Sequence, residues 1–165
     1  MGPELRGDFD WLAQQPGAKS CCLRDLLEPL NLASVQRGQF AASLPENEWR
    51  EFVLSPWIEG AGEDIAWRRE LWEWLGPRVR RETGAGQAAQ VVARELHKWV
   101  SLQSKSHPQG IAASWLGGVG DGIYFAQMHV AALRSAGIPA RFTKAGGCER
   151  RTESGWERVP DQVGN

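Results

Sequence analysis

The chain has 165 residues, of which 42% are hydrophobic and 24% charged, and its formal net charge is −1 at pH 7. This length suits one domain with one core, and the composition is that of a globular protein rather than a disordered one. A net charge so close to zero does not indicate the excess of positive charge that attracts nucleic acid or an anionic membrane. The N-terminal residues form neither a leader peptide nor a membrane span. We therefore expect neither a nucleic-acid partner nor a membrane partner.

The number and spacing of the cysteines and histidines indicate whether disulfides or a metal site can be expected. The three cysteines are Cys21, Cys22 and Cys148, an odd count with two adjacent residues, which is a poor framework for disulfides. Such usage favours a reducing compartment, and with no leader peptide in the sequence it favours the cytoplasm. The three histidines have no metal-binding spacing among themselves. We expect no metal and no cofactor.

The first third of the chain alternates polar and apolar stretches. Residues 1–20 are polar and marked by glycine and proline, so we expect an arm. Leucines at helical spacing predict a helix that follows Ser20, and Pro29 should limit its length. A short capped turn of helix is expected from residue 43 onward, and Pro56 should end it.

Two amphipathic helices are expected in the middle of the chain. The first lies within residues 62–84, where an apolar stripe includes two tryptophans and where Gly76-Pro77 should kink or divide the helix. The second lies within residues 86–104, and its apolar stripe places Trp99 on the inner face. Residues 105–120 read as a loop.

The last third of the chain predicts a helix followed by strands. Asp121 is a good N-cap for a helix that ends at Gly137, since Pro139 follows two residues later. The segment IPARFT at 138–143 reads as a short strand. Residues 144–160 then predict one hairpin with its turn at Glu153-Ser154-Gly155.

The stretch GDGIYFAQMHVAALRSAGIPARF, residues 120–142, resembles the core motif of the transglutaminase-like superfamily. That motif has a glycine, one further residue, a cysteine, a helix ending in an alanine/leucine/arginine run, and GIPAR opening a strand. The resemblance covers roughly residues 45–145. It implies an α+β fold with helices packed on a small antiparallel sheet, shorter here than in the family. Residues 1–44 would form an N-terminal arm and helical segment, and residues 45–165 a core that is incomplete at its C-terminal end.

The resemblance also implies a catalytic triad. In the family, a cysteine at the helix N-terminus is the nucleophile, because the helix dipole favours its thiolate. A histidine on a following strand pairs with it, and an acid orients the histidine. The cysteine position falls on Gly122, which has no side chain, and no histidine follows His129. Asp161 is a loose match to the acid, at a longer spacing than usual after Trp156. Trp156 follows Arg141 by only 15 residues, which leaves little room for a histidine-bearing strand.

Three functions follow from this pattern. The first is a transglutaminase-like domain without catalytic activity, a binding or scaffold module that takes a peptide, protein or saccharide in a cleft at the helix N-terminus, flanked by Trp115, Asp121 and Tyr124. The alternative is a thiol-dependent acyl transferase or peptidase whose nucleophile is substituted at Gly122 or whose remaining triad lies outside this chain. The third is a structural module within a larger assembly, which an exposed apolar face would favour.

Overall fold

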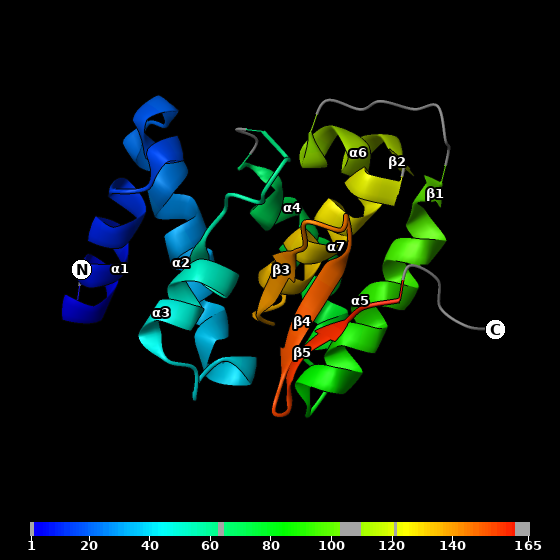
Figure 1. Cartoon of the computed structure of the whole chain (residues 1–165). Coiled ribbons are helices and arrows are strands. Elements are labelled where there is room, and N and C mark those ends of the chain that lie inside the picture. The colour runs from blue at the N-terminus through cyan, green and yellow to red at the C-terminus, as the bar shows by residue number, and fades with distance from the viewer. Residues whose placement is uncertain (1, 63–64, 103–109, 121, 161–165) are drawn as a thin grey trace.

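The computed structural model describes residues 2–62, 65–102, 110–120 and 122–160, and helices make up most of this part of the chain (Figure 1). The helical segments are α1 (Pro3–Ala13), the 3₁₀-helix η1 (Pro16–Ser20), α2 (Leu23–Phe40), α3 (Glu46–Trp49), the π-helix η2 (Arg50–Leu54), α4 (Trp67–Val79), α5 (Ala85–Trp99), α6 (Ile111–Gly117) and α7 (Gly122–Ser135). The strands are β1 (Ser101–Leu102), β2 (Val119–Gly120), β3 (Ala140–Phe142), β4 (Cys148–Thr152) and β5 (Gly155–Arg158).

The strands form two sheets. β3, β4 and β5 make an antiparallel sheet in that order, with Phe142 opposite Cys148 and Arg151 opposite Trp156. This confirms the strand at GIPAR and the hairpin after it. β1 and β2 form a separate parallel pair of two residues each. Helices packed with a small antiparallel sheet give the α+β fold that the sequence predicted.

Helix α7 lies at the centre of the molecule, between the antiparallel sheet and helices α4, α5 and α6 (Figure 1). Every residue from Phe125 to Ser135 is buried, because the run of alanines lets neighbouring elements approach the helix from all sides. Gly137, with φ of +77°, ends the helix as predicted, since glycine adopts this left-handed conformation without steric cost. The amide of Ile138 donates to the carbonyl of Leu133 at 2.9 Å and closes the last turn.

The expected N-terminal arm is instead a packed helix, and that expectation was wrong. Leu12 of α1 is fully buried in a second hydrophobic cluster, together with Leu30 of α2 and Trp49 of α3. The carboxylate of Asp8 is buried beside it and accepts hydrogen bonds from Trp49 Nε1 at 3.1 Å and from Arg50 Nε at 2.8 Å. The polar appearance of this segment hid one apolar face, which a neighbouring helix covers.

Three further expectations differ from the structure. Pro29 lies inside α2 and Pro77 inside α4, and neither helix is divided. A proline inside a helix costs about 3 kcal/mol, and burial of the surrounding leucines offsets that cost. Part of the expected loop at 105–120 forms α6, in which Ile111 and Trp115 are buried four residues apart on one side of the helix.

Two buried arginines tie α7 to the rest of the molecule. Arg68 of α4 is 1% exposed and donates to the carbonyls of Arg134, Val53 and Leu54 at 2.9, 2.6 and 3.1 Å. Burial, with a smaller contribution from the charge of Arg134, lowers the pKa of the Arg68 guanidinium to about 9. The acceptors are main-chain oxygens at the end of η2 and of α7, so Arg68 joins three elements at one point.

Arg134, in the alanine/leucine/arginine run, makes the complementary set of bonds. Its Nε donates to the carbonyl of Ala140 at the start of β3, at 3.0 Å. Its Nη1 donates to the carbonyls of Ser55 and Trp57 at 2.9 and 3.0 Å. Arg134 therefore fixes the segment after η2 and the first residue of β3 to the end of α7.

Replacement of Arg134 by methionine should lower the free energy of unfolding by about 3 kcal/mol or more, since buried carbonyl groups would lose their donors. Arg69→Met is the matched control. Arg69 is more than half exposed and pairs with Glu28, so its loss should cost less than about 1 kcal/mol. Urea unfolding followed by tryptophan fluorescence measures both. Equal, small losses would contradict the role given to Arg134.

A buried histidine should make the protein sensitive to acid. Burial lowers the pKa of His129 to about 3, and the charge of His97 contributes in the same direction. The unfolded chain, in which the pKa is near 6.5, therefore binds more protons between pH 6.5 and 3, so stability is lost as the pH falls through this window. The loss approaches about 1.4 kcal/mol per pH unit from this group. In His129→Leu the slope of unfolding free energy against pH should flatten; an unchanged slope would refute this assignment.

Candidate functional site

The N-terminus of α7 is exposed at one end of the molecule. Gly122 is its first residue. Among the residues that the structure describes, no atom beyond its chain neighbours and the nearby backbone of α7 lies within 4 Å of the position that a Cβ would occupy. The adjacent Ile123 is 54% exposed. The backbone at this position therefore has open space for a side chain, and the sequence places none there.

The short parallel pair of strands brings three helix ends together at this site. β1 follows α5 directly, and β2 joins the end of α6 to the start of α7, so their pairing holds the end of α5 beside the segment that enters α7 (Figure 1). Gly118, with φ of +61°, ends α6 in the left-handed conformation. A Cβ at Gly118 would lie 3.2 Å from the carbonyl oxygen of Trp99, so this close approach also favours glycine.

Trp115, which the sequence predicted to flank the cleft, is packed in the core. It is 8% exposed, and its ring centroid lies 4.5 Å from that of Trp74 and 5.4 Å from that of Trp99. Trp99 Nε1 donates to the carbonyl of Trp115 at 2.8 Å. Trp99 itself is 50% exposed, so its predicted inward orientation was wrong: as the last residue of α5, it covers Trp115 from outside.

Three exposed apolar side chains, which the sequence did not predict as a group, lie on the helix ends that meet at the start of α7. Trp99 ends α5, Leu116 is near the end of α6 and is 69% exposed, and Ile123 is in the first turn of α7. We call these three side chains the apolar rim. Tyr124, the other aromatic residue predicted here, is partly exposed in the first turn of α7. A signal was present in the sequence, because Leu116 and Ile123 stand on either side of a glycine-rich segment that separates two helices.

The strand that follows GIPAR is β4, so the predicted lack of room for it was wrong. A tight turn suffices: Gly146 has φ of +80°, and a Cβ there would lie 4.0 Å from Ile123. The β3–β4 turn therefore reaches the first turn of α7. The first residue of β4 is Cys148, which is buried, and neither β4 nor β5 contains a histidine.

His129 does not replace the histidine of that strand. It lies seven residues into α7, about 10 Å along the helix axis from Gly122. Its ring is buried beside Phe125, with ring centroids 5.9 Å apart, and its Nε2 has no hydrogen-bond partner among the described residues. The ring therefore belongs to the core.

The two predicted carboxylates, Asp121 and Asp161, lie outside the described residues. Within the described ranges, no group of three or more His, Cys, Asp or Glu side chains is arranged to hold a metal ion. In the same part of the chain, no helix is both long and apolar enough to cross a membrane.

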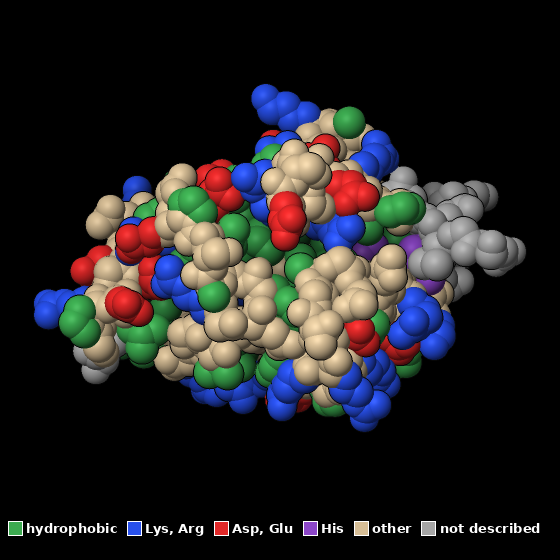
Figure 2. All heavy atoms as spheres, turned by 90° about the horizontal axis from the view of Figure 1, so that it is seen from below, with side chains coloured by type: hydrophobic (Ala, Val, Ile, Leu, Met, Phe, Trp, Pro, Cys, Tyr) green, Lys and Arg blue, Asp and Glu red, His purple; other side chains and the backbone are tan. Residues whose placement is uncertain are grey.

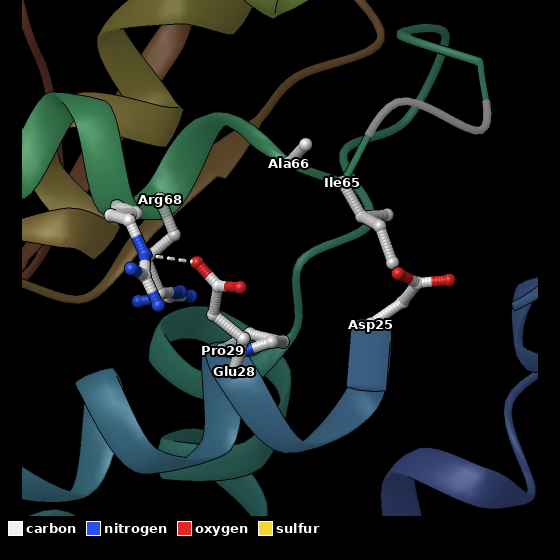
Figure 3. Close-up of a pocket in the computed structure, with 7 residues that line it drawn as sticks. Asp25, Glu28, Pro29, Ile65, Ala66 and Arg68 are labelled. Carbon is white, nitrogen blue, oxygen red and sulfur yellow. Dashed lines mark hydrogen bonds and ion pairs between the residues drawn. The ribbon is translucent and has the colours of Figure 1, made fainter. Parts of the chain in front are cut away.

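A pocket elsewhere in the molecule lies between α2 and α4 (Figure 3). Asp25 and Glu28 line it from α2, and Arg68 and Arg69 from α4. Glu28 pairs with Arg69 across the pocket, with 2.5 Å between Oε1 and Nε. This pocket is a junction between two helices and is separate from the start of α7.

Comparison with known families agrees with the motif. The family model described as the transglutaminase-like superfamily matches residues 75–157, just over half of the chain. Neither the curated proteins nor the solved structures that were compared gave a match. The matched range begins at the end of α4, includes the whole of α7 and extends into β5. The chain therefore belongs to the transglutaminase-like superfamily.

Proposed function

We propose that this transglutaminase-like domain binds a peptide, protein or saccharide at the N-terminal end of α7 without catalysing its conversion. The observation that carries the proposal is Gly122: the position that corresponds to the family cysteine has no side chain and is solvent-exposed. The positive end of a 14-residue helix remains there to attract carbonyl oxygen or anionic groups.

The surroundings of Gly122 support binding over catalysis. In the family, a histidine on the following strand would act as the base, and here that strand begins with buried Cys148. The apolar rim of Trp99, Leu116 and Ile123 provides surface for a ligand beside the helix end. An aromatic face with polar backbone groups next to it suits a peptide or a sugar ring.

A second candidate is a thiol-dependent acyl transferase or peptidase whose nucleophile is substituted at Gly122 or whose remaining triad lies outside this chain. The open space at Gly122 favours it, because a cysteine side chain would fit there without displacing any neighbour. The two candidates differ in what a restored thiol would do.

The native chain should incorporate no fluorescent primary amine into the dipeptide N-benzyloxycarbonyl-Gln-Gly above the rate in buffer. The variant Gly122→Cys should gain a reactive thiol, because the helix dipole lowers the pKa of a thiol at this position below the ordinary value of about 8.5. Its turnover should nonetheless stay at the buffer rate, since no base is paired with the thiol.

The measurement is pH-dependent alkylation of each cysteine, read by mass spectrometry, alongside the amine-incorporation rate. Free N-acetylcysteine in the same buffer serves as the reference thiol, because Cys22 itself lies at the N-cap of α2. Turnover that appears in Gly122→Cys would establish the enzymatic alternative. Thiol-dependent turnover by the native chain would refute the non-catalytic proposal.

Binding at the helix end should be visible by NMR. Titration with N-benzyloxycarbonyl-Gln-Gly or with the trimer of N-acetylglucosamine should shift the backbone amides of Ile123 and Tyr124. The variant Gly122→Phe should weaken that binding about tenfold, because its side chain would occupy the open space. The matched control Gly38→Phe, at another glycine with open space, should leave it unchanged. Shifts confined to other parts of the molecule for both probes would contradict the proposed location.

A further inference from the structure

A cluster of positive charge lies on the surface formed by α4 and α5. The carboxylate of Glu95 is approached by Lys98 Nζ at 3.1 Å, by Arg78 Nε at 3.3 Å and by Arg94 Nε at 3.6 Å. The Glu95 side chain is only 13% exposed, whereas those of Arg78, Arg94 and Lys98 are 44, 54 and 64% exposed. One carboxylate balances one cation, so this cluster presents an excess of two positive charges to solvent.

Glu95 is ionised within the cluster. Burial by itself would raise the pKa of its carboxyl group, but the hydrogen bond and charge of Lys98, with the charge of Arg78, outweigh burial, so the pKa lies below its ordinary value. Arg78 also stacks over the ring of Trp74, 5.4 Å from its centroid, which holds the guanidinium at the surface. In this arrangement the mostly buried carboxylate of Glu95 lies at the centre, and three more exposed cationic side chains surround it.

The cluster adjoins exposed apolar side chains. Trp74, beneath Arg78, stacks on Trp115, and Trp115 stacks in turn on Trp99, which directly follows Lys98. Leu116 follows Trp115 and is exposed. Trp99 lies one helical turn after Glu95 on α5. We call the exposed cations and apolar side chains on these three helices the basic–apolar surface: Arg78, Arg94, Lys98, Trp99 and Leu116.

We infer that the basic–apolar surface docks an acidic peptide segment that carries an apolar side chain. The acidic groups would pair with the cations that Glu95 leaves in excess, and the apolar side chain would cover Trp99 and Leu116. Charge is unevenly distributed over the molecule: on the face that Figure 2 shows, Lys and Arg side chains line the lower edge. The net charge of the chain, −1, gives no extended basic surface of the kind that a nucleic-acid backbone requires, so a short acidic peptide is the better match to this cluster.

This surface shares Trp99 and Leu116 with the apolar rim beside Gly122, whereas its cations lie on α4 and α5, so reversal of those charges tests this inference separately from the proposed function. The experiment uses the full chain and a fluorescein-labelled peptide of sequence Glu-Asp-Glu-Leu-Leu-Asp-Glu, with binding followed by fluorescence anisotropy in about 50 mM salt, where surface charges are weakly screened. The comparison peptide has glutamine in place of the three glutamates and asparagine in place of the two aspartates.

The double variant Arg94→Glu/Lys98→Glu should weaken binding of the acidic peptide at least about tenfold, and Leu116→Ser about threefold, as expected for charge and apolar contacts at a surface. Glu95→Gln should strengthen binding severalfold, because it removes the competing anion. The matched control Arg24→Glu, an exposed charge reversal on α2, should change affinity less than about twofold. Thermal unfolding of each variant checks that it is folded.

Three results would overturn the inference. The neutral peptide could bind as tightly as the acidic one. Glu95→Gln could leave the affinity of a folded protein unchanged or lower it. A single-stranded 20-mer of DNA could bind more tightly than the peptide and be insensitive to Leu116→Ser, in which case the surface would be a general polyanion site.

Discussion

The interior of this protein is organised around two guanidinium groups that bind main-chain carbonyls. Arg68 and Arg134 are both buried, and they donate hydrogen bonds to main-chain carbonyl oxygens. Such a group is expensive to bury, and it is retained where several acceptors converge on it. Here the acceptors come from the end of η2, from the segment after it, from the end of α7 and from the start of β3. Elements far apart in the chain are thereby joined at one point.

The position of α7 follows from that junction. Its C-terminal end is fixed by Arg134 and by the turn at Gly137, and its sides are buried from Phe125 to Ser135. Only the first turn reaches the surface, between the ends of α5 and α6. The fold therefore exposes the N-terminal turn of α7 to solvent and buries the remainder of that helix. A nucleophile carried at a helix N-terminus requires this arrangement. In this chain the backbone arrangement is present, and the side chain at Gly122 is hydrogen.

Family membership and chemistry are separate matters in such a protein. The family match covers α5, α6, α7 and the antiparallel sheet. The arrangement of these elements depends on how their side chains pack. A triad depends instead on a few side chains at particular positions, and a fold does not guarantee them. The surface around the helix end has apolar side chains at Trp99, Leu116 and Ile123, so its composition is that of a contact surface. The binding function that we propose rests on these side chains.

The sequence by itself determined the elements whose signals are local. The run from Val130 to Arg141 predicted the central helix, its end at Gly137 and the strand that follows, because each depends on neighbouring residues. The lack of a side chain at Gly122 is likewise a fact of the sequence. The hairpin of β4 and β5 also followed from its turn residues.

Tertiary structure decided what depends on distant partners. The periodicity of residues 86–104 put Trp99 on the buried face of its helix. In the structure Trp115 occupies the core and Trp99 packs over it at the surface, which depends on contacts between α5 and α6. A polar N-terminal segment became a helix because α2 covers its apolar face. Arg68 looked like any other charge in an amphipathic helix. Its burial is possible because the carbonyl oxygens of η2 and α7 accept its hydrogen bonds. These acceptors are 14 or more residues away in the sequence, so no local sequence pattern predicts their position.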